Sequence, residues 1–256
     1  MSFTEQRRAE ILGIVRRQGF VSIDELVRRF EVTPQTIRRD LNEMAAESLL
    51  ERFHGGAGLA SSAENLAYPE RRVLRQEEKR RIGQLVARHV PERASLFINI
   101  GTTTEAVAQA LLTHRSLNVV TNNLNVAQML GQKEAFRVIV AGGLVRPRDG
   151  GIVGEAAIDL IRQFRVDIGI IGISAIDQDG SLLDFDYREV RVAQAIIENS
   201  RKVFLAADHS KFQRSAMVRL GHVRQLHALF TDRPPPPPVA ELLAEAQVGV
   251  YTTGES

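Results

Sequence analysis

The chain of 256 residues has no cysteine and no tryptophan. Without cysteine it cannot form disulfide bonds or the cysteine-rich class of zinc site. No apolar run approaches the roughly twenty residues that a membrane-spanning helix needs, and the closest, residues 168–176, has the length of a buried strand. Residues 1–8 lack the apolar core of a signal peptide. These absences predict a cytoplasmic protein that does not contact a membrane.

A marked excess of one charge is also missing. The formal net charge is +2, and residues 1–60 hold nine arginines and nine acidic residues, which cancel. Composition therefore neither favours nor excludes nucleic acid as a partner, and a DNA-binding argument depends on where the arginines lie. The 44% of hydrophobic and 25% of charged residues are typical of a folded globular protein. A chain of this length has room for two domains.

The first part of the chain has the pattern of three short helices. Apolar residues recur with a helical period over residues 4–18. Ser22, with Glu25 three positions later, predicts the capped start of a second helix. Thr33 then predicts the N-cap of a third helix and Pro34 its first residue, because proline at that position loses no hydrogen bond.

The third helix has the composition of a DNA recognition helix. Its apolar residues lie on one side and leave glutamine, threonine and arginine on the other. The first turns of such a helix enter the major groove, where arginine pairs with guanine and glutamine with adenine. Residues 49–58 alternate apolar and polar and end in glycines, which predicts a hairpin, the wing of a winged helix-turn-helix. The residues expected to contact DNA are Thr33, Gln35, Thr36, Arg38, Arg39, Asn42, Arg52 and His54.

A solvated charged face on a helical packing module is the alternative interpretation of a single pair of arginines. Residues 33–42 (Thr-Pro-Gln-Thr-Ile-Arg-Arg-Asp-Leu-Asn) and 52–57 (Arg-Phe-His-Gly-Gly-Ala) favour DNA binding instead. Both segments resemble the helix-turn-helix signature of the DeoR family of bacterial repressors. The resemblance implies operator double-stranded DNA as a partner, bound by a homodimer or homotetramer.

Residues 59–76 are rich in small and polar residues and then in arginine, without a clear period, which predicts a linker. The arginines within it are expected to be solvated rather than to contact DNA; they are Arg71, Arg72 and Arg75. The predicted domains are therefore a winged helix-turn-helix over residues 1–58, the linker, and an effector domain over residues 77–256. From residue 77 onward helical and strand-like segments alternate, which predicts an α/β fold with a Rossmann-like, mostly parallel sheet.

Polar or glycine-rich loops follow four of the predicted strands, where ligands bind in open α/β sheets. Glycine allows close backbone approach, and free N–H groups at a helix start and a lysine ammonium both favour phosphate. A single such loop is as easily explained by turn chemistry, but four in succession favour a ligand. The residues expected to bind it are Gly101, Thr102, Thr103, Thr104, Thr121, Asn122, Asn123, Gly142, Gly143, Glu155, Asp184 and Lys211.

The same loops resemble the effector domain of the DeoR family, which is similar in fold to ribose-5-phosphate isomerases. The resemblance implies a small sugar or polyol phosphate as the effector. Residues 97–103, 119–127, 148–155 and 180–187 carry the likeness, and within the family they imply glycerol 3-phosphate. Asn99 departs from the pattern, because such loops usually carry aspartate there.

A sugar-phosphate isomerase with an accessory DNA-binding domain is the rival hypothesis. Isomerization needs a positioned base and an electrophile for the developing enediolate, and Glu155, Asp184 and Asp186 are possible bases. Similar isomerases carry a lysine in this part of the chain, but no lysine lies between Lys133 and Lys202. We therefore expect a sensor without catalytic residues, cofactor or metal.

Overall fold

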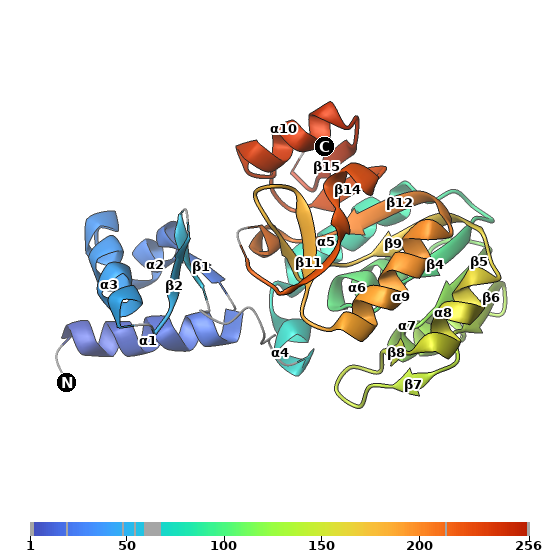
Figure 1. Ribbon diagram of the computed structural model, residues 1–256, viewed down its shortest axis with the longest axis horizontal. Helices are drawn as coiled ribbons and strands as arrows, with labels where there is room; N and C mark the ends of the chain where they lie inside the picture. Colours follow the sequence, from blue (N-terminus) through green and yellow to red (C-terminus); the bar gives the residue numbers. More distant parts are fainter. Residues whose placement is uncertain are drawn as a thin grey trace.

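The computed structural model describes most of the chain and shows a small head beside a larger α/β domain (Figure 1). The described residues are 3–18, 20–47, 49–53, 55–58, 68–212 and 214–254. None of the helices within these ranges is long and apolar enough to cross a membrane.

The head contains three helices and a three-stranded sheet. Its helices are α1 (Phe3–Gln18), α2 (Ile23–Phe30) and α3 (Pro34–Ala46), and its strands are β1 (Phe20–Ser22), β2 (Glu51–Phe53) and β3 (Gly56–Gly58). Strands β2 and β3 form the predicted wing, and β1 pairs with the other side of β3. The sequence did not predict β1. Ile11, Leu26, Ile37 and Leu41 are fully buried where the three helices meet.

The helix starts in the head are the predicted ones. The Ser22 hydroxyl accepts a hydrogen bond from the backbone N–H of Glu25 at 3.2 Å. The Thr33 hydroxyl accepts one from the backbone N–H of Thr36 at 3.2 Å, and Pro34 is the first residue of α3. These side-chain caps satisfy N–H groups that would otherwise lack a partner at a helix start.

The larger domain is built on a seven-stranded sheet in the order β15-β14-β12-β9-β4-β5-β6. The strands are β4 (Ser95–Ile98), β5 (Leu117–Thr121), β6 (Phe136–Val140), β9 (Val166–Ile171), β12 (Ser200–Ala206), β14 (Ala228–Thr231) and β15 (Gly249–Thr252). Every neighbouring pair is parallel, which confirms the predicted parallel α/β sheet. Central strands such as β9 are almost continuously apolar because both of their faces are buried.

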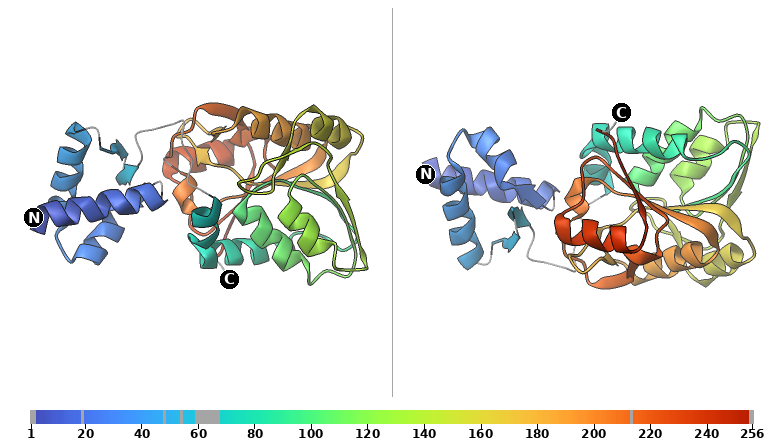
Figure 2. Two further views of the ribbon diagram at one scale, coloured as in Figure 1. Left: turned by 90° about the horizontal axis from the view of Figure 1, so that it is seen from below. Right: turned by 90° about the horizontal axis from the view of Figure 1, so that it is seen from above.

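Helices cover both faces of this sheet (Figure 2). They are α5 (Gln76–Arg88), α6 (Thr102–Leu111), α7 (Leu124–Leu130), α8 (Glu155–Arg162), α9 (Tyr187–Glu198) and α10 (Pro237–Glu245). Residues of α5, α6 and α7, among them Ile82, Leu111 and Leu130, form one apolar core with residues of the sheet. Residues of α8, α9 and α10 form a second core with residues of the sheet. This two-sided arrangement leaves the strand ends free to carry a site.

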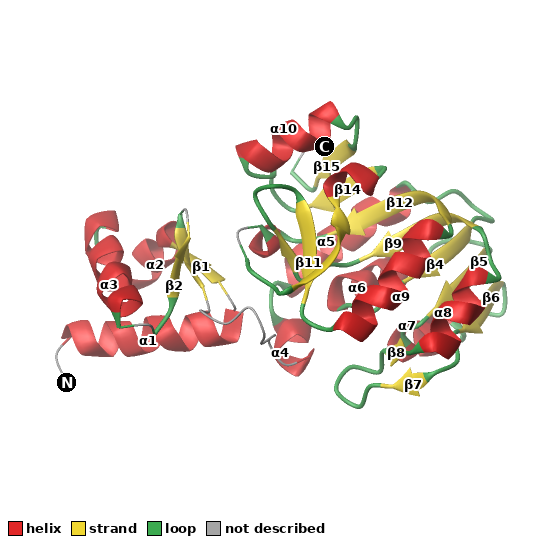
Figure 3. Ribbon diagram, in the orientation of Figure 1, coloured by secondary structure: helices red, strands yellow, loops and turns green. Residues whose placement is uncertain are grey.

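Short antiparallel strands extend beyond the main sheet (Figure 3). They are β7 (Leu144–Val145) paired with β8 (Ile152–Val153), and β10 (Ala175–Ile176), β11 (Ser181–Asp184) and β13 (Val218–His222) in a second sheet. The sequence did not predict them, because two- to five-residue strands lack a clear period and depend on partners distant in the chain.

The predicted linker is partly helical. Its last part holds α4 (Tyr68–Val73), and α5 begins at its final residue, Gln76. Residues 59–67 lie outside the described residues, so the domain boundaries stay a prediction. The expectation that the linker arginines are solvated is wrong for Arg71 and Arg75. The Arg71 side chain is 18% exposed and its Nη2 atom lies 3.6 Å from Oδ2 of Asp149, and the Arg75 side chain is 11% exposed and its Nε atom lies 3.8 Å from Oδ1 of Asp208. These charges are partly buried because carboxylates of the effector domain are their partners.

Candidate functional site

One face of α3 gathers the polar residues that the sequence predicted to read DNA. A shallow groove along this helix is lined by Thr33, Gln35, Thr36, Arg38, Arg39 and Asn42. The opposite side of α3 buries Ile37, Leu41 and Met44 in the core of the head. Because the apolar residues hold the helix in place, its polar residues point outward as a recognition helix requires.

The wing adds one further arginine beside this face. Arg52 on β2 is partly buried, and its Nη1 atom has no hydrogen-bond partner among the described residues. Burial, and then the neighbouring positive charge of Arg38, lower the pKa of Arg52. Among the described residues, these two guanidinium groups lie near each other without a shared carboxylate, an arrangement that a phosphate would stabilise. His54, the other residue predicted on the wing, lies outside the described residues.

A pocket in the larger domain brings together five of the residues predicted to bind the effector. These are Gly101, Thr102, Thr103, Asp184 and Lys211. The pocket lies where β4, β9 and β12 end, and its other lining residues are Arg71, Ile100, Gly172, Ile173, Ser174 and Glu189. The general expectation that ligands bind at the carboxyl ends of parallel strands favours this pocket as the effector site.

The loop between β4 and α6 presents a helix start to the pocket. Gly101 precedes α6 with a φ of +146°, a conformation that favours glycine, and no side chain caps the helix. The N–H groups of the first turn are thus available to an anion. The Thr104 hydroxyl instead donates to the carbonyl oxygens of Asn99 and Gly101, at 2.7 and 2.8 Å. Thr104 therefore stabilises the loop and is not among the residues that line the pocket.

Positive charge enters the pocket from Lys211 and Arg71. Burial lowers the pKa of Lys211 to about 7, although the nearby carboxylate of Asp208 acts in the opposite direction. Arg214, 8% exposed, does not line the pocket but lies nearby, with its guanidinium carbon 5.0 Å from the ring centre of Phe185. These cations gather at one end of the strands, where an anionic ligand would be attracted.

Two carboxyl groups face the same pocket. Asp184 accepts hydrogen bonds from the Ser174 hydroxyl at 3.0 Å and from the backbone N–H of Phe185 at 2.7 Å. Glu189 accepts one from Nη1 of Arg146 at 2.6 Å. Burial raises the pKa of Asp184, and burial followed by the Asp184 charge raises the pKa of Glu189 to about 7. Carboxyl groups held in this way can both donate to and accept from the hydroxyl groups of a ligand.

Arg146 connects the pocket carboxylate of Glu189, through Asp149, to Arg71 on α4 in the last part of the linker. Its Nη2 atom lies 2.5 Å from Oδ2 of Asp149, the same oxygen that faces Arg71. Sequence reasoning missed Arg71, Arg146 and Glu189. Nothing local marks them, because arginine and glutamate on helices and loops are usually solvated.

The remaining residues of the predicted effector set do not line the pocket. The Thr121 hydroxyl donates to the carbonyl of Ile98 at 2.6 Å, and the Asn122 amide donates to that of Ile152 at 3.1 Å. Asn123 caps α7, while Gly142 and Gly143 precede β7. The Glu155 side chain is 70% exposed and lies 3.4 Å from Arg191. The loops after β5 and β6 thus have structural partners or lie elsewhere, and a ligand role for these residues stays a prediction.

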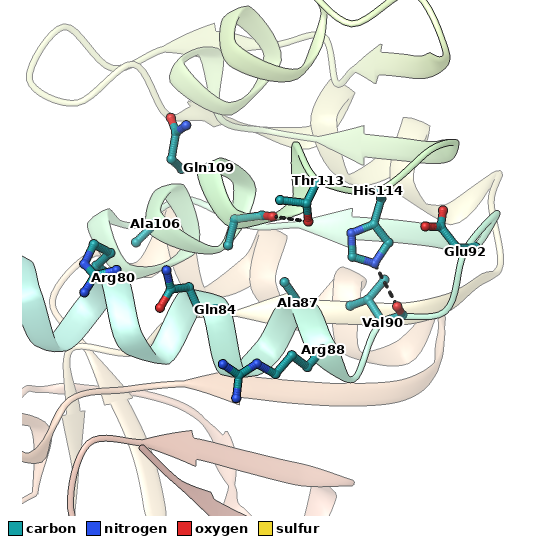
Figure 4. Close-up of a pocket in the computed structure, with 11 residues that line it drawn as sticks. Arg80, Gln84, Ala87, Arg88, Val90, Glu92, Ala106, Gln109, Thr113 and His114 are labelled. Carbon is teal, nitrogen blue, oxygen red and sulfur yellow. Dashed lines mark hydrogen bonds between the residues drawn. The ribbon is translucent and has the colours of Figure 1, made fainter. Parts of the chain in front are cut away.

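A larger groove lies between α5 and α6 (Figure 4). The two helices can approach closely because Gly83 has no side chain. A Cβ at this position would lie 2.5 Å from the carbonyl oxygen of Ala106. Arg80 at the groove is paired with Glu77 at 2.7 Å. None of the predicted effector residues lines the groove. It lacks the strand ends and the free helix start of the pocket, so the pocket is the better candidate. No group of residues that could hold a metal ion occurs in the described part of the chain.

Comparison with known proteins agrees with this division into a head and a sensor. Residues 7–63 match the DeoR-like helix-turn-helix domain, and residues 74–233 match the DeoR C terminal sensor domain. The chain belongs to the DeoR family. This DeoR-family protein is 56% identical over 243 residues to the glycerol-3-phosphate regulon repressor of Escherichia coli (strain K12). The matched region covers 95% of this chain and 96% of the relative.

Other relatives of this DeoR-family chain are also repressors. The glycerol-3-phosphate regulon repressor of Haemophilus influenzae is 55% identical over 229 residues, or 90% of this chain and 89% of the relative. The HTH-type transcriptional repressor CsqR of Escherichia coli (strain K12) is 40% identical over 259 residues, or 100% and 99%. These relatives are named transcriptional repressors and not enzymes, so the comparisons support a repressor with a helix-turn-helix and a sensor domain, and the isomerase hypothesis is not favoured.

Among solved structures, ribose 5 phosphate isomerase A from Neisseria gonorrhoeae aligns with a TM-score of 0.39 and 16% identity, covering 52% of each chain. The eIF2B delta structure from Chaetomium thermophilum aligns with a TM-score of 0.47 and 16% identity, covering 61% of this chain and 56% of the other.

Proposed function

We propose that this repressor binds operator DNA through the outer face of α3 and the wing, and that glycerol 3-phosphate releases it by binding the pocket at the start of α6. The regulon named for two relatives, at 56% and 55% identity, supports this choice of effector. The proposed DNA contacts are Thr33, Gln35, Thr36, Arg38, Arg39, Asn42, Arg52 and His54. The protein would act in the cytoplasm as a homodimer or homotetramer that places two recognition helices on one operator.

The chemistry of the pocket supports a small polyol phosphate. A phosphate at the start of α6 would accept hydrogen bonds from the free N–H groups that follow Gly101 and would lie among the charges of Lys211 and Arg71. The carboxyl groups of Asp184 and Glu189 suit the hydroxyl groups of the ligand. A phosphate at one end and hydroxyl groups at the other are the two features of glycerol 3-phosphate.

The observation that carries the proposal is the position of Arg71. This residue lines the pocket, and it also lies on α4, the helix that follows the segment leading from the head. Its Nε atom is buried and has no hydrogen-bond partner among the described residues. An incoming phosphate could supply that partner. The ligand and the connection to the DNA-binding head would then share one side chain.

Other contacts hold α4 against the effector domain. The Tyr68 hydroxyl donates to Oε2 of Glu105 at 2.9 Å and accepts from the Asn125 amide at 2.9 Å. The Lys79 ammonium donates to the carbonyl oxygens of Arg71 and Leu74, the latter at 2.8 Å. A ligand that draws Arg71 away from Asp149 would disturb this docking. If the ligand-bound arrangement spaces the two heads wrongly for the operator, binding shifts the population toward free DNA.

The test is an operator gel shift with the full-length chain, titrated separately with glycerol 3-phosphate, ribose 5-phosphate and glycerol. We expect glycerol 3-phosphate to release the operator and glycerol, which lacks the phosphate, to have no effect. Release by ribose 5-phosphate alone would support a sensor of sugar phosphates instead of glycerol 3-phosphate. If neither phosphate changes operator affinity, the induction model is wrong.

A further inference from the structure

A cluster of charges joins α1 to the inner side of the recognition helix. Asp40 of α3 is fully buried, and its oxygens accept from Nε of Arg7 at 2.6 Å and from Nε of Arg8 at 3.4 Å. A buried carboxylate is stable only when such partners satisfy it. These contacts attach the back of α3 to α1 and so set the direction in which the front of α3 faces.

Glu43 lies one turn further along α3 and stands between two arginines. Its Oε2 atom accepts from Nη2 of Arg8, and its Oε1 atom lies 3.9 Å from Nε of Arg39. Arg8 is 22% exposed and Arg39 is 68% exposed. The closer and less exposed partner of Glu43 is thus Arg8 of α1, whereas Arg39 on the outer face of α3 lies at the distance limit of an ion pair.

This arrangement accounts for the charge balance that composition left unexplained. Helix α3 alone contains two arginines, Arg38 and Arg39, and two carboxylates, Asp40 and Glu43, which sum to zero. Because Asp40 and Glu43 have closer partners on α1, the arginines of α3 remain largely available, and Arg39 keeps only the 3.9 Å contact with Glu43. An unpaired carboxylate on a recognition helix would instead repel phosphate and compete for the arginines.

We propose that Arg8 is a positioning residue for DNA binding: it occupies Glu43, so that Arg39 stays free to hold a DNA phosphate. The proposal rests on the proposed role of α3 in reading the operator. Loss of Arg8 would free Glu43 to pair with Arg39, its neighbour four residues away on the same helix. Arg8 therefore acts on DNA affinity through Glu43 and need not touch DNA.

The test compares the Arg8→Gln, Glu43→Gln and doubly substituted full-length chains by fluorescence anisotropy with labelled operator at several salt concentrations. We expect Arg8→Gln to weaken binding by about threefold or more, the scale of one surface ion pair, and to reduce the salt slope by up to roughly one. Glu43→Gln alone should bind at least as tightly as the wild type. The double variant should recover most of the lost affinity, because the competing carboxylate is gone.

A purely structural role for Arg8 predicts a different outcome. If Arg8 only ties α1 to α3, the double variant loses both sides of the contact and binds no better than Arg8→Gln, which would overturn the proposal. Unchanged binding by Arg8→Gln would also overturn it. Arg29→Gln is the matched control, because it removes the same charge from a pair with Glu10 at 2.7 Å that does not involve α3. Its effect should be smaller and should not be reversed by Glu43→Gln.

Arg39→Ala separates this proposal from the DNA assignment itself. Weakened binding by Arg39→Ala together with an unaffected Arg8→Gln would leave the DNA face in place and reject only the role of Arg8. Unchanged binding by Arg39→Ala would reject the use of Arg39 as a phosphate contact and this proposal with it. The thermal unfolding temperature of each variant, compared with that of the wild type, shows whether its DNA-binding head is still folded.

Discussion

The outer face of α3 and the network behind the effector pocket differ in how far their charged residues are exposed. On the DNA face of α3, Arg39 is 68% exposed and has only a distant carboxylate. In the effector domain, Arg146 and Asp149 are 5% and 1% exposed and lie in a closed network with Glu189. DNA is a large polyanion that needs exposed and uncompensated positive charge. A small anion can instead be recognised by buried charges that balance one another until the ligand arrives.

The two sites also differ in how they are assembled. The DNA face consists mainly of one helix and its cap, so residues close in the sequence carry it. The proposed effector pocket takes residues from α4, the start of α6, the segment after β9, β11, α9 and the segment after β12. Damage to a single residue should therefore stay local in the head, whereas in the effector domain it should spread through the buried network.

The largest expected effect is on stability and concerns Arg146→Ala. Removal of this guanidinium leaves the carboxylates of Asp149 and Glu189 buried without their main partner, which costs about 3–5 kcal/mol of the free energy of unfolding. Arg148→Ala is the control, since Arg148 is 55% exposed and should cost less than about 1 kcal/mol. Urea unfolding measures both. Equal losses would contradict the contrast between buried and exposed charge.

The next effect concerns effector response and Lys211→Ala. Loss of a buried charged partner should weaken glycerol 3-phosphate binding by about 2–5 kcal/mol while leaving operator affinity without effector intact. Isothermal titration and the operator gel shift measure the two quantities. Lys202→Ala, at an exposed lysine of β12, is the control and should change neither. Loss of operator binding together with effector binding would mean that Lys211 has a structural role instead.

Arg38→Ala and Arg39→Ala should have intermediate effects on operator binding. Each should weaken it by about 1–3 kcal/mol, with lost sequence discrimination if the arginine contacts a base and a reduced salt slope if it holds a phosphate. Glycerol 3-phosphate binding should stay as in the wild type, because the effector pocket takes no residue from α3. Unchanged operator binding in both variants would reject the assignment of α3 to the major groove.

The smallest effect is a pH dependence of effector affinity. Burial lowers the pKa of Lys211 to about 7 in the free protein, and a bound phosphate dianion would raise it again by favouring the ammonium form. Binding then takes up a proton above pH 7, so affinity should fall as the pH rises, by up to about 1.4 kcal/mol per pH unit. Titrations at pH 7 and pH 8 measure this change. Lys211→Ala should reduce it, and an identical slope in that variant would assign the proton to another group.

Glu189 is the obvious other group in that titration, because burial and the charge of Asp184 raise its pKa to about 7. A phosphate nearby would raise that pKa further and would again couple binding to proton uptake. Glu189→Gln removes the titration of this side chain while keeping its shape. We compare the pH dependence of effector affinity in Glu189→Gln and in Lys211→Ala. The variant that loses more of this dependence identifies the residue that takes up more of the proton.

Sequence patterns predicted the head better than the pocket. The caps at Ser22 and Thr33 and the position of Pro34 were confirmed, because a cap involves only residues within one helical turn. The parallel sheet was confirmed as well, since alternating strands and helices allow few arrangements. Of the residues predicted to bind the effector, Gly101, Thr102, Thr103, Asp184 and Lys211 line one pocket, whereas the loops after β5 and β6 do not line it, and the binding role of the whole set stays a prediction.

The sequence by itself determined the kinds of domain, the face of α3 that points outward and the alternation of strands and helices that gives the parallel sheet. Helix caps, periodicity and glycine conformations act over a few residues, so the chain carries them locally. Only the tertiary structure decided which charges are free. Arg7 and Arg8 are paired with carboxylates of α3, and Arg71, expected in solvent, lies in the effector pocket. Charge pairing depends on distance in space and on burial, and neither follows from separation along the chain.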